Sequence, residues 1–259
     1  MNLSDLTNTD QSWFDIPPVQ AAGGRNAARK LQNSSNQMAF FKTPALHVQG
    51  NEVLGYVMAN KLNLPCAEVK FATLPDPTGQ PTDGILSFKI TGVELMEWPL
   101  VADKIRNSPM EYIMNYEDIG RIAAFDIWTH NNDRSTANLI ISNKVEWKEK
   151  YIIYMIDHEE CFYGYPETCN RTEDNPAWSI LTNFVSIPEI KEAIKFSKIE
   201  PFISKIEAID DSELKALVDL VPIKYYNSTQ AGLVFEILQK RRDTLRKIIN
   251  DWCSAEGKL

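Results

Sequence analysis

Histidine and cysteine, the residues that most often build zinc sites and disulfide frameworks, are scarce in this chain of 259 residues. The histidines are His47, His130 and His158, and no H-E-x-x-H or other zinc-binding spacing connects them. The cysteines are widely separated and form no C-x-x-C pair, which predicts reduced cysteines with structural roles. These absences exclude a zinc enzyme and a disulfide-stabilised secreted domain. The four cysteines are Cys66, Cys161, Cys169 and Cys253.

Long apolar runs and an excess of positive charge are also lacking. No stretch approaches the length that spans a bilayer, and residues 1–15 show no basic region followed by an apolar run. The 27 basic and 35 acidic residues give a net charge of −8, which provides no general attraction to nucleic acid or to an anionic membrane. The sequence therefore predicts a cytoplasmic protein that binds neither nucleic acid nor membrane.

The glycine motifs of common nucleotide-binding and hydrolase sites are missing as well. The chain has no G-x-G-x-x-G, no P-loop G-K-[ST] and no G-x-S-x-G elbow. Gly23 and Gly24, in the stretch AAGGRNAARK, remain as a candidate loop over phosphates. A plain hairpin turn is the favoured interpretation of the same pair.

The order of the predicted elements changes along the chain. The first third favours strands with one helix, which Gly50-Asn51 introduces and Pro65 stops, and the remainder favours helices. We therefore expect an α+β protein with two unequal lobes, residues 1–92 and 93–259, joined near 90–97. Strands are predicted at 38–43, 66–73, 84–90, 138–142 and 151–156. Helices are predicted at 99–115, 117–130, 187–208, 210–221 and 229–253.

Three polar residues, separated by short stretches of chain, occupy positions suited to phosphoryl transfer. Asp133 lies in a polar loop after a helix, Asn138 begins an apolar strand, and Asp157 ends the next strand, YIIYMI. The first Asp can hold an acceptor hydroxyl, and the Asn and second Asp can hold Mg²⁺ on ATP phosphates. Single residues of this kind also cap and turn the chain, which is the alternative interpretation.

A lysine and a glutamate suggest the phosphate-binding side of the same site. Lys42 follows Phe40-Phe41 on an apolar strand, where an unpaired charge is costly. Glu52 opens the next helix, and a strand Lys paired with a helix Glu orients the lysine toward phosphates in kinases. An edge-strand lysine in solvent and a glutamate favoured by the helix dipole would explain both residues without a site.

These segments resemble the HipA-like kinases, within the wider protein-kinase-like and phosphatidylinositol-kinase-like superfamily. MAFFKT with GNEVLGYVMANKLNLPCAEVKF is similar to the segment that carries their Lys strand and Glu helix. NNDRSTANLII and YMIDHEECF resemble their catalytic loop and metal-binding strand. The matched pieces cover roughly residues 23–162, and the last hundred residues match no pattern.

The resemblance implies a bilobal protein-kinase-like fold, with ATP and Mg²⁺ bound between a strand-rich lobe and a helical lobe. It implies that Lys42 contacts phosphates and that Glu52 holds this lysine. It assigns Asp133 to the acceptor hydroxyl, and Asn138 and Asp157 to the metal. The chain departs from protein kinases in having Asp157-His158-Glu159 in place of D-F-G, and in placing His130 three residues before Asp133 instead of two.

Three functions are consistent with these residues. The favoured one is an ATP- and Mg-dependent serine/threonine kinase that phosphorylates a protein, itself included. The second is a small-molecule kinase of the aminoglycoside or choline kinase type, with acidic residues for a cationic acceptor. The third is a kinase-like binding module without turnover. The acidic residues are Glu160, Glu167, Glu173 and Asp174.

Overall fold

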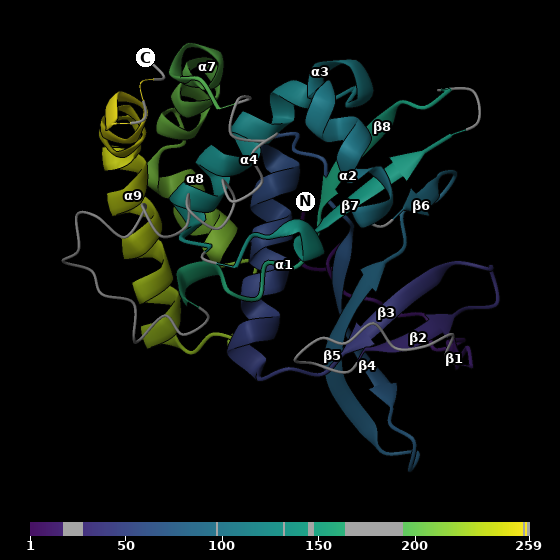
Figure 1. Cartoon of the computed structure of the whole chain (residues 1–259). Coiled ribbons are helices and arrows are strands. Elements are labelled where there is room, and N and C mark those ends of the chain that lie inside the picture. The colour runs from purple at the N-terminus through teal and green to yellow at the C-terminus, as the bar shows by residue number, and fades with distance from the viewer. Residues whose placement is uncertain are drawn as a thin grey trace.

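An antiparallel sheet and a group of helices make up the two sides of the molecule, with one long helix, α1, between them (Figure 1). The computed structural model describes residues 1–17, 28–96, 98–131, 133–144, 148–163, 194–255 and 257. The observed class is α+β, as the order of elements in the sequence predicts.

The larger sheet has five strands in the order β1-β2-β3-β5-β4, all paired antiparallel. Alternation along the strands divides their side chains between two apolar clusters. In β4, for example, Val69 and Phe71 belong to the main core, whereas Ala72 and Leu74 pack on the opposite face. The strands are β1 Phe14–Asp15, β2 Arg29–Gln32, β3 Met38–Lys42, β4 Val69–Pro75 and β5 Pro81–Phe88.

Helix α1, Leu46–Lys61, is buried at every position from Gln49 to Ala59. Burial on all sides is typical of a helix enclosed between other elements, here the sheet on one side and the C-terminal helices on the other (Figure 1). The helix begins at Leu46 and not at the predicted Gly50-Asn51. Glu52 therefore lies in the helix interior and is only 1% exposed, so the predicted position at the helix start is wrong.

A second, three-stranded sheet has the order β6-β7-β8. It consists of β6 Glu94–Met96, β7 Leu139–Asn143 and β8 Tyr151–Met155, again antiparallel. The chain that leaves α1 runs beside β8, because Met155 N–H donates to Pro65 O and Ala67 N–H donates to Met155 O. The end of β8 is thereby connected to the segment between α1 and β4.

The helices after residue 97 follow the predicted pattern with one interruption. The predicted helix 99–115 divides into α2, Trp98–Asn107, and α3, Pro109–Tyr112, because Pro109 disfavours a helical conformation at Ser108. The first residues of the predicted helix 187–208 lie outside the described residues. The other helices are α4 Tyr116–Thr129, α7 Phe196–Glu207, α8 Asp211–Val218 and α9 Ser228–Ala255, with short 3₁₀ turns at Thr136–Asn138 and Cys161–Tyr163.

One continuous apolar core joins the sheet, α1 and the C-terminal helices. Phe71 of β4 stacks on Tyr225 with ring centroids 4.0 Å apart, and Trp128 of α4 donates its indole N–H to the carbonyl of Leu238 in α9. The residues after 194 thus help to position α1 and the strands around it. In the part of the chain that the structure describes, no helix has the length and apolar character needed to cross a membrane.

Candidate active site

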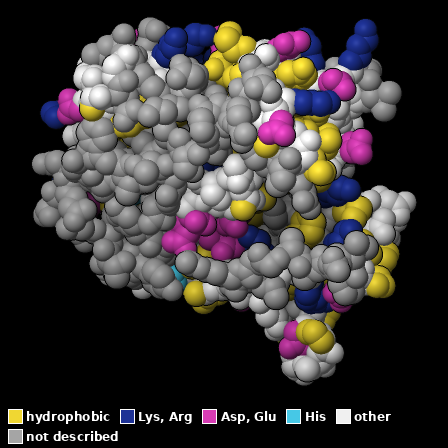
Figure 2. Space-filling view, viewed as in Figure 1, with side chains coloured by type: hydrophobic (Ala, Val, Ile, Leu, Met, Phe, Trp, Pro, Cys, Tyr) yellow, Lys and Arg dark blue, Asp and Glu magenta, His cyan; other side chains and the backbone are white. Residues whose placement is uncertain are grey.

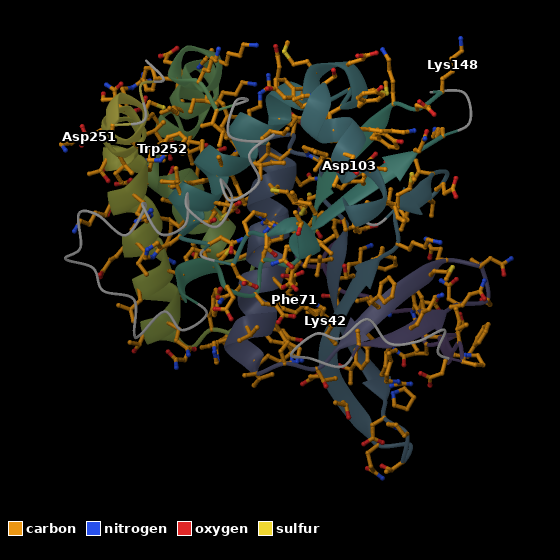
Figure 3. All side chains as sticks on the ribbon, viewed as in Figure 1. Lys42, Phe71, Asp103, Lys148, Asp251 and Trp252 are labelled. Atoms are coloured by element: carbon orange, nitrogen blue, oxygen red, sulfur yellow. The ribbon has the colours of Figure 1, made fainter. Side chains whose placement is uncertain are left out.

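Lys42 is the last residue of β3 and lies where the sheet meets α1, near the middle of the molecule (Figure 3). Its Nζ atom is 3.2 Å from Asp157 Oδ2 and 3.0 Å from Glu159 Oε1. The three side chains are 17%, 30% and 12% exposed, respectively, so the pairs are largely shielded from water. The structure thus brings the predicted phosphate-contacting lysine and the predicted metal ligand Asp157 together.

Three carboxylates surround the single ammonium group of Lys42. Burial alone would lower the pKa of Lys42, but the carboxylates of Glu52, Asp157 and Glu159 more than offset burial and raise it above its ordinary value. Burial raises the pKa of Glu52 to about 8, with a further increase from the charge of Asp157. A cluster of acids around one lysine favours the arrival of additional positive charge. Figure 2 shows Asp and Glu side chains gathered near the middle of this face, beside Lys or Arg.

Glu52 binds the backbone instead of the lysine. Its Oε2 atom accepts a hydrogen bond from the N–H of His158. Within the described residues, the ion pairs of Lys42 are with Asp157 and Glu159. The contact predicted between Lys42 and Glu52 is therefore corrected: Lys42 has other carboxylate partners, and Glu52 fixes the segment that carries them.

Asp133 and Asn138 are joined across the loop that follows α4. The Asn138 amide nitrogen donates to the backbone O of Asp133 at 2.7 Å and to its Oδ2 at 3.2 Å. The Asp133 N–H is capped by Asn131 Oδ1 at 3.2 Å. Asp133 is exposed and Asn138 is buried. With its nitrogen used in this way, Asn138 retains an amide oxygen as the atom that suits a cation.

Arg134, a residue with no predicted role, connects this loop to Ile156, the residue before Asp157. Its guanidinium forms a bidentate ion pair with Asp126 of α4, at 2.9 and 3.1 Å. Its Nη1 atom donates to the carbonyls of Asn138 and Ile156, at 3.0 and 2.5 Å. The available signal was Asp126, a charged residue within a buried helix, because such a residue needs a partner.

Asp157 has a left-handed backbone conformation, with φ of 64°. This conformation is uncommon for residues other than glycine, although Asp tolerates it better than most. The residues on both sides are held: Ile156 N–H donates to Asn138 O at 3.1 Å, and His158 N–H donates to Glu52. Such constraints maintain an unfavourable backbone conformation and direct the Asp157 carboxylate toward Lys42.

Asn51 of α1 holds the segment that follows Asp157. Its amide nitrogen donates to the carbonyls of Glu159 and Cys161, both at 3.0 Å. Tyr226 donates its hydroxyl to the Asn51 amide oxygen at 2.5 Å. A residue from the region after α8 thereby fixes the loop, a connection that no local sequence pattern indicates.

The two histidines near the site are buried and neutral. His130 ends α4 in a left-handed conformation, and burial, reinforced by Arg241, lowers its pKa to about 2. His158 packs against Phe125 and lies 3.4 Å from Arg134 through its Nδ1 atom. Burial likewise lowers the pKa of His158 well below its ordinary value. These contacts favour structural roles for both residues.

Several of the predicted site residues are not among the residues that the structure describes. Gly23 and Gly24, expected over the phosphates, lie outside the described residues, as do the acidic Glu167, Glu173 and Asp174. Among the described residues, no three His, Cys, Asp or Glu side chains form a metal-binding group. Mg²⁺ does not need one, since it commonly binds one or two protein ligands together with substrate phosphates and water. Asn138 and Asp157 fit that kind of site.

Comparison with known proteins supports the fold. No family model and no curated protein sequence matches the chain. Among solved structures, the proinflammatory kinase CtkA of Helicobacter pylori has a TM-score of 0.60 at 14% identity, covering 95% of this chain and 97% of that one. The MAP kinase LmaMPK10 of Leishmania major covers 93% and 82% at 12% identity, but its TM-score of 0.33 is too low to support an argument. The chain has a protein-kinase-like α+β fold.

Proposed function

We propose that this protein is an ATP- and Mg²⁺-dependent phosphotransferase. The observation that carries the proposal is the convergence of Lys42 on Asp157, together with the linkage of the Asp133–Asn138 loop to Ile156 through Arg134. These are the residue types that position phosphates, metal and acceptor in kinases. A kinase-like fold around this arrangement adds support.

In the proposed reaction each residue has one task. Lys42 would contact the phosphates of ATP, and the Asn138 amide oxygen and the Asp157 carboxylate would hold the metal. When bound, Mg²⁺ neutralises charge on the phosphates. Asp133, which is exposed at the loop, accepts a hydrogen bond from the acceptor hydroxyl and takes its proton as the hydroxyl oxygen bonds to the γ-phosphorus of ATP and ADP leaves. Glu52 and Arg134 act indirectly, by holding the backbone around Asp157.

The acceptor in this proposal is a Ser or Thr hydroxyl of a protein, the chain itself included, as the resemblance to HipA-like kinases implies. Nucleotide would lie between the predicted lobes, residues 1–92 and 93–259. The two alternatives are a kinase whose acceptor is a small cationic alcohol and a kinase-like binding module without turnover. The transfer experiment below distinguishes them from a protein kinase.

The test is thermal unfolding of the full chain with ATP, with Mg²⁺ and with both. A ligand at about 100 times its Kd adds about 2.7 kcal/mol to the free energy of unfolding. We expect a shift that needs both components and that Asp157→Ala abolishes. The absence of a shift under every condition would overturn the nucleotide site.

Transfer is then measured with radiolabelled ATP on the protein alone, on a generic protein substrate and on small amino alcohols. Asp133→Ala should abolish labelling while retaining the ATP-dependent thermal shift, because Asp133 contacts the acceptor and not the nucleotide. Equal loss of nucleotide binding in this variant would contradict the role of Asp133. Nucleotide binding without any transfer would favour a binding module.

A further inference from the structure

The position of Glu159 raises the question of which carboxylate orients Lys42. Glu159 Oε1 is 3.0 Å from Lys42 Nζ, slightly closer than Asp157 Oδ2 at 3.2 Å. Its side chain is 12% exposed, against 30% for Asp157. Glu52, the predicted partner, instead accepts a hydrogen bond from the His158 N–H at its Oε2 atom. Glu159 is therefore the most shielded of the carboxylates in contact with the ammonium group.

In the proposed reaction, Asp157 and Glu159 differ in how well each can remain paired with Lys42. Asp157 cannot serve Lys42 and a metal equally, because a divalent cation attracts its carboxylate more strongly than one ammonium group does. A lysine side chain is long and flexible and needs a partner to define its direction. If Asp157 held a metal ion, Glu159 would remain as the carboxylate partner of Lys42.

The backbone of Glu159 is well positioned for this task. Its carbonyl accepts from the Asn51 amide nitrogen at 3.0 Å, and Asn51 is itself held by the hydroxyl of Tyr226. The preceding N–H, that of His158, is bound by Glu52. Helix α1 thus fixes the loop from which Glu159 reaches Lys42. Lys42 belongs to strand β3, so the backbone is restrained at both residues.

We propose that Glu159 is the positioning residue that holds Lys42 toward the phosphates, while Glu52 of α1 fixes the backbone of residues 157–159. The role of the Lys42–Glu159 pair in catalysis rests on the proposed phosphotransferase function. It reassigns the lysine-orienting role from the helix glutamate to a residue two positions after Asp157.

The first experiment is a double-mutant cycle in phosphotransfer, with Lys42→Met and Glu159→Gln alone and combined. Glu159→Gln should lower kcat/KM by about 10- to 100-fold, the range of one charge-assisted hydrogen bond. In the Lys42→Met background it should cause little further loss, because the two residues act as a unit. An undiminished loss in that background, or a loss below about twofold from Glu159→Gln alone, would overturn the proposal.

The second experiment does not depend on activity. The rate at which an amine-acylating reagent labels Lys42 is followed by mass spectrometry in the protein without nucleotide. Removing the Glu159 carboxylate should raise that rate, because the ammonium group loses one of its two ion pairs and keeps only the longer contact with Asp157 at 3.2 Å. Unchanged labelling would refute the contact. Faster labelling in a protein that shows no transfer would retain the Lys42–Glu159 pair and reject only the proposed function.

The chain supplies a matched control. Glu68 and Lys70 form an ion pair of the same residue types at the same 3.0 Å distance, but with side chains 46% and 27% exposed. Glu68→Gln should leave both transfer and the labelling of Lys42 unchanged. A general effect of lost negative charge would instead appear in both variants and would count against a specific role of Glu159.

Discussion

Arg134 and Asp126 form an ion pair in which the side chains are 0% and 1% exposed. Two charges removed from water in this way are costly unless every hydrogen-bonding group is satisfied. The remaining donors of Arg134 bind the carbonyls of Asn138 and Ile156, so the same guanidinium satisfies backbone groups on both sides of the candidate site. At the scale of single residues, this arginine links folding stability to the geometry of the site.

Arg134→Met should lower the free energy of unfolding by about 3–5 kcal/mol, because it leaves Asp126 charged, buried and unpaired. The double variant Arg134→Met/Asp126→Leu should recover much of this loss but not the thermal shift with Mg²⁺ and ATP, since the carbonyl contacts remain broken. Urea unfolding measures the first effect. Arg121→Met, which removes an arginine whose side chain is 41% exposed and pairs with Asp118, should change stability by no more than about 0.5 kcal/mol. A similar loss in both single variants would contradict this account.

At the scale of elements, α1 is the helix that brings the parts of the site into register. It supplies Glu52 to the His158 N–H and Asn51 to the carbonyls of Glu159 and Cys161. Gly55 allows the close approach, because a Cβ atom at this position would lie 2.5 Å from the Cβ of His158. A helix packed this tightly against the loop determines where Asp157 and Glu159 point.

Gly55→Ala should therefore push α1 and the loop apart, with a loss of about 1–3 kcal/mol in unfolding free energy and a weaker thermal shift with Mg²⁺ and ATP. Gly232→Ala is the matched control in helix α9, where an added Cβ meets nothing within 4 Å. In that variant, we expect a gain of about 0.5–1 kcal/mol, since alanine favours helix more than glycine does. Equal behaviour of the two variants would mean that the contact with His158 has no consequence.

At the scale of the whole molecule, buried ionisable groups make stability depend on pH. His130 lies between α4 and the candidate loop, and burial, with a smaller effect from the charge of Arg241 in α9, lowers its pKa to about 2. The unfolded chain binds a proton near pH 6.5 and the folded chain does not, so the contribution of His130 is complete above about pH 6.5 and declines as the pH falls toward 2. Glu52, with its raised pKa, contributes the opposite slope, because the folded state binds more protons than the unfolded state between about pH 4.5 and 8.

Comparing His130→Asn with the parent protein isolates the histidine. Asn tolerates the left-handed conformation of this position and does not titrate. Between about pH 7.5 and 5.5, the parent should lose about 1.4 kcal/mol more than the variant, as measured by urea unfolding at each pH. Parallel pH curves would show that His130 is not held neutral in the folded state.

The fold and the site were predictable from the sequence to different degrees. Strand β3, Met38–Lys42, and helix α4, Tyr116–Thr129, agree with the predicted 38–43 and 117–130 within a residue or so, because their patterns are local. The start of α1 was misplaced because residues 46–49 lack a clear capping signal, and their helical state depends on packing. The roles of Lys42, Asp133, Asn138 and Asp157 stay predictions, although the structure gathers Lys42 with Asp157 and Asp133 with Asn138.

The sequence by itself determined where most of the helices and strands form and which polar residues stand at their ends, since periodicity, propensity and turn residues act over a few positions. The tertiary structure alone decided which charges meet. Lys42 pairs with residues 115 and 117 positions away, Glu52 binds a backbone group 106 positions away, and Tyr226 holds Asn51 across 175. Hydrogen bonds and ion pairs depend on separations of about 3 Å, and spacing along the chain does not specify separations of that size between distant elements.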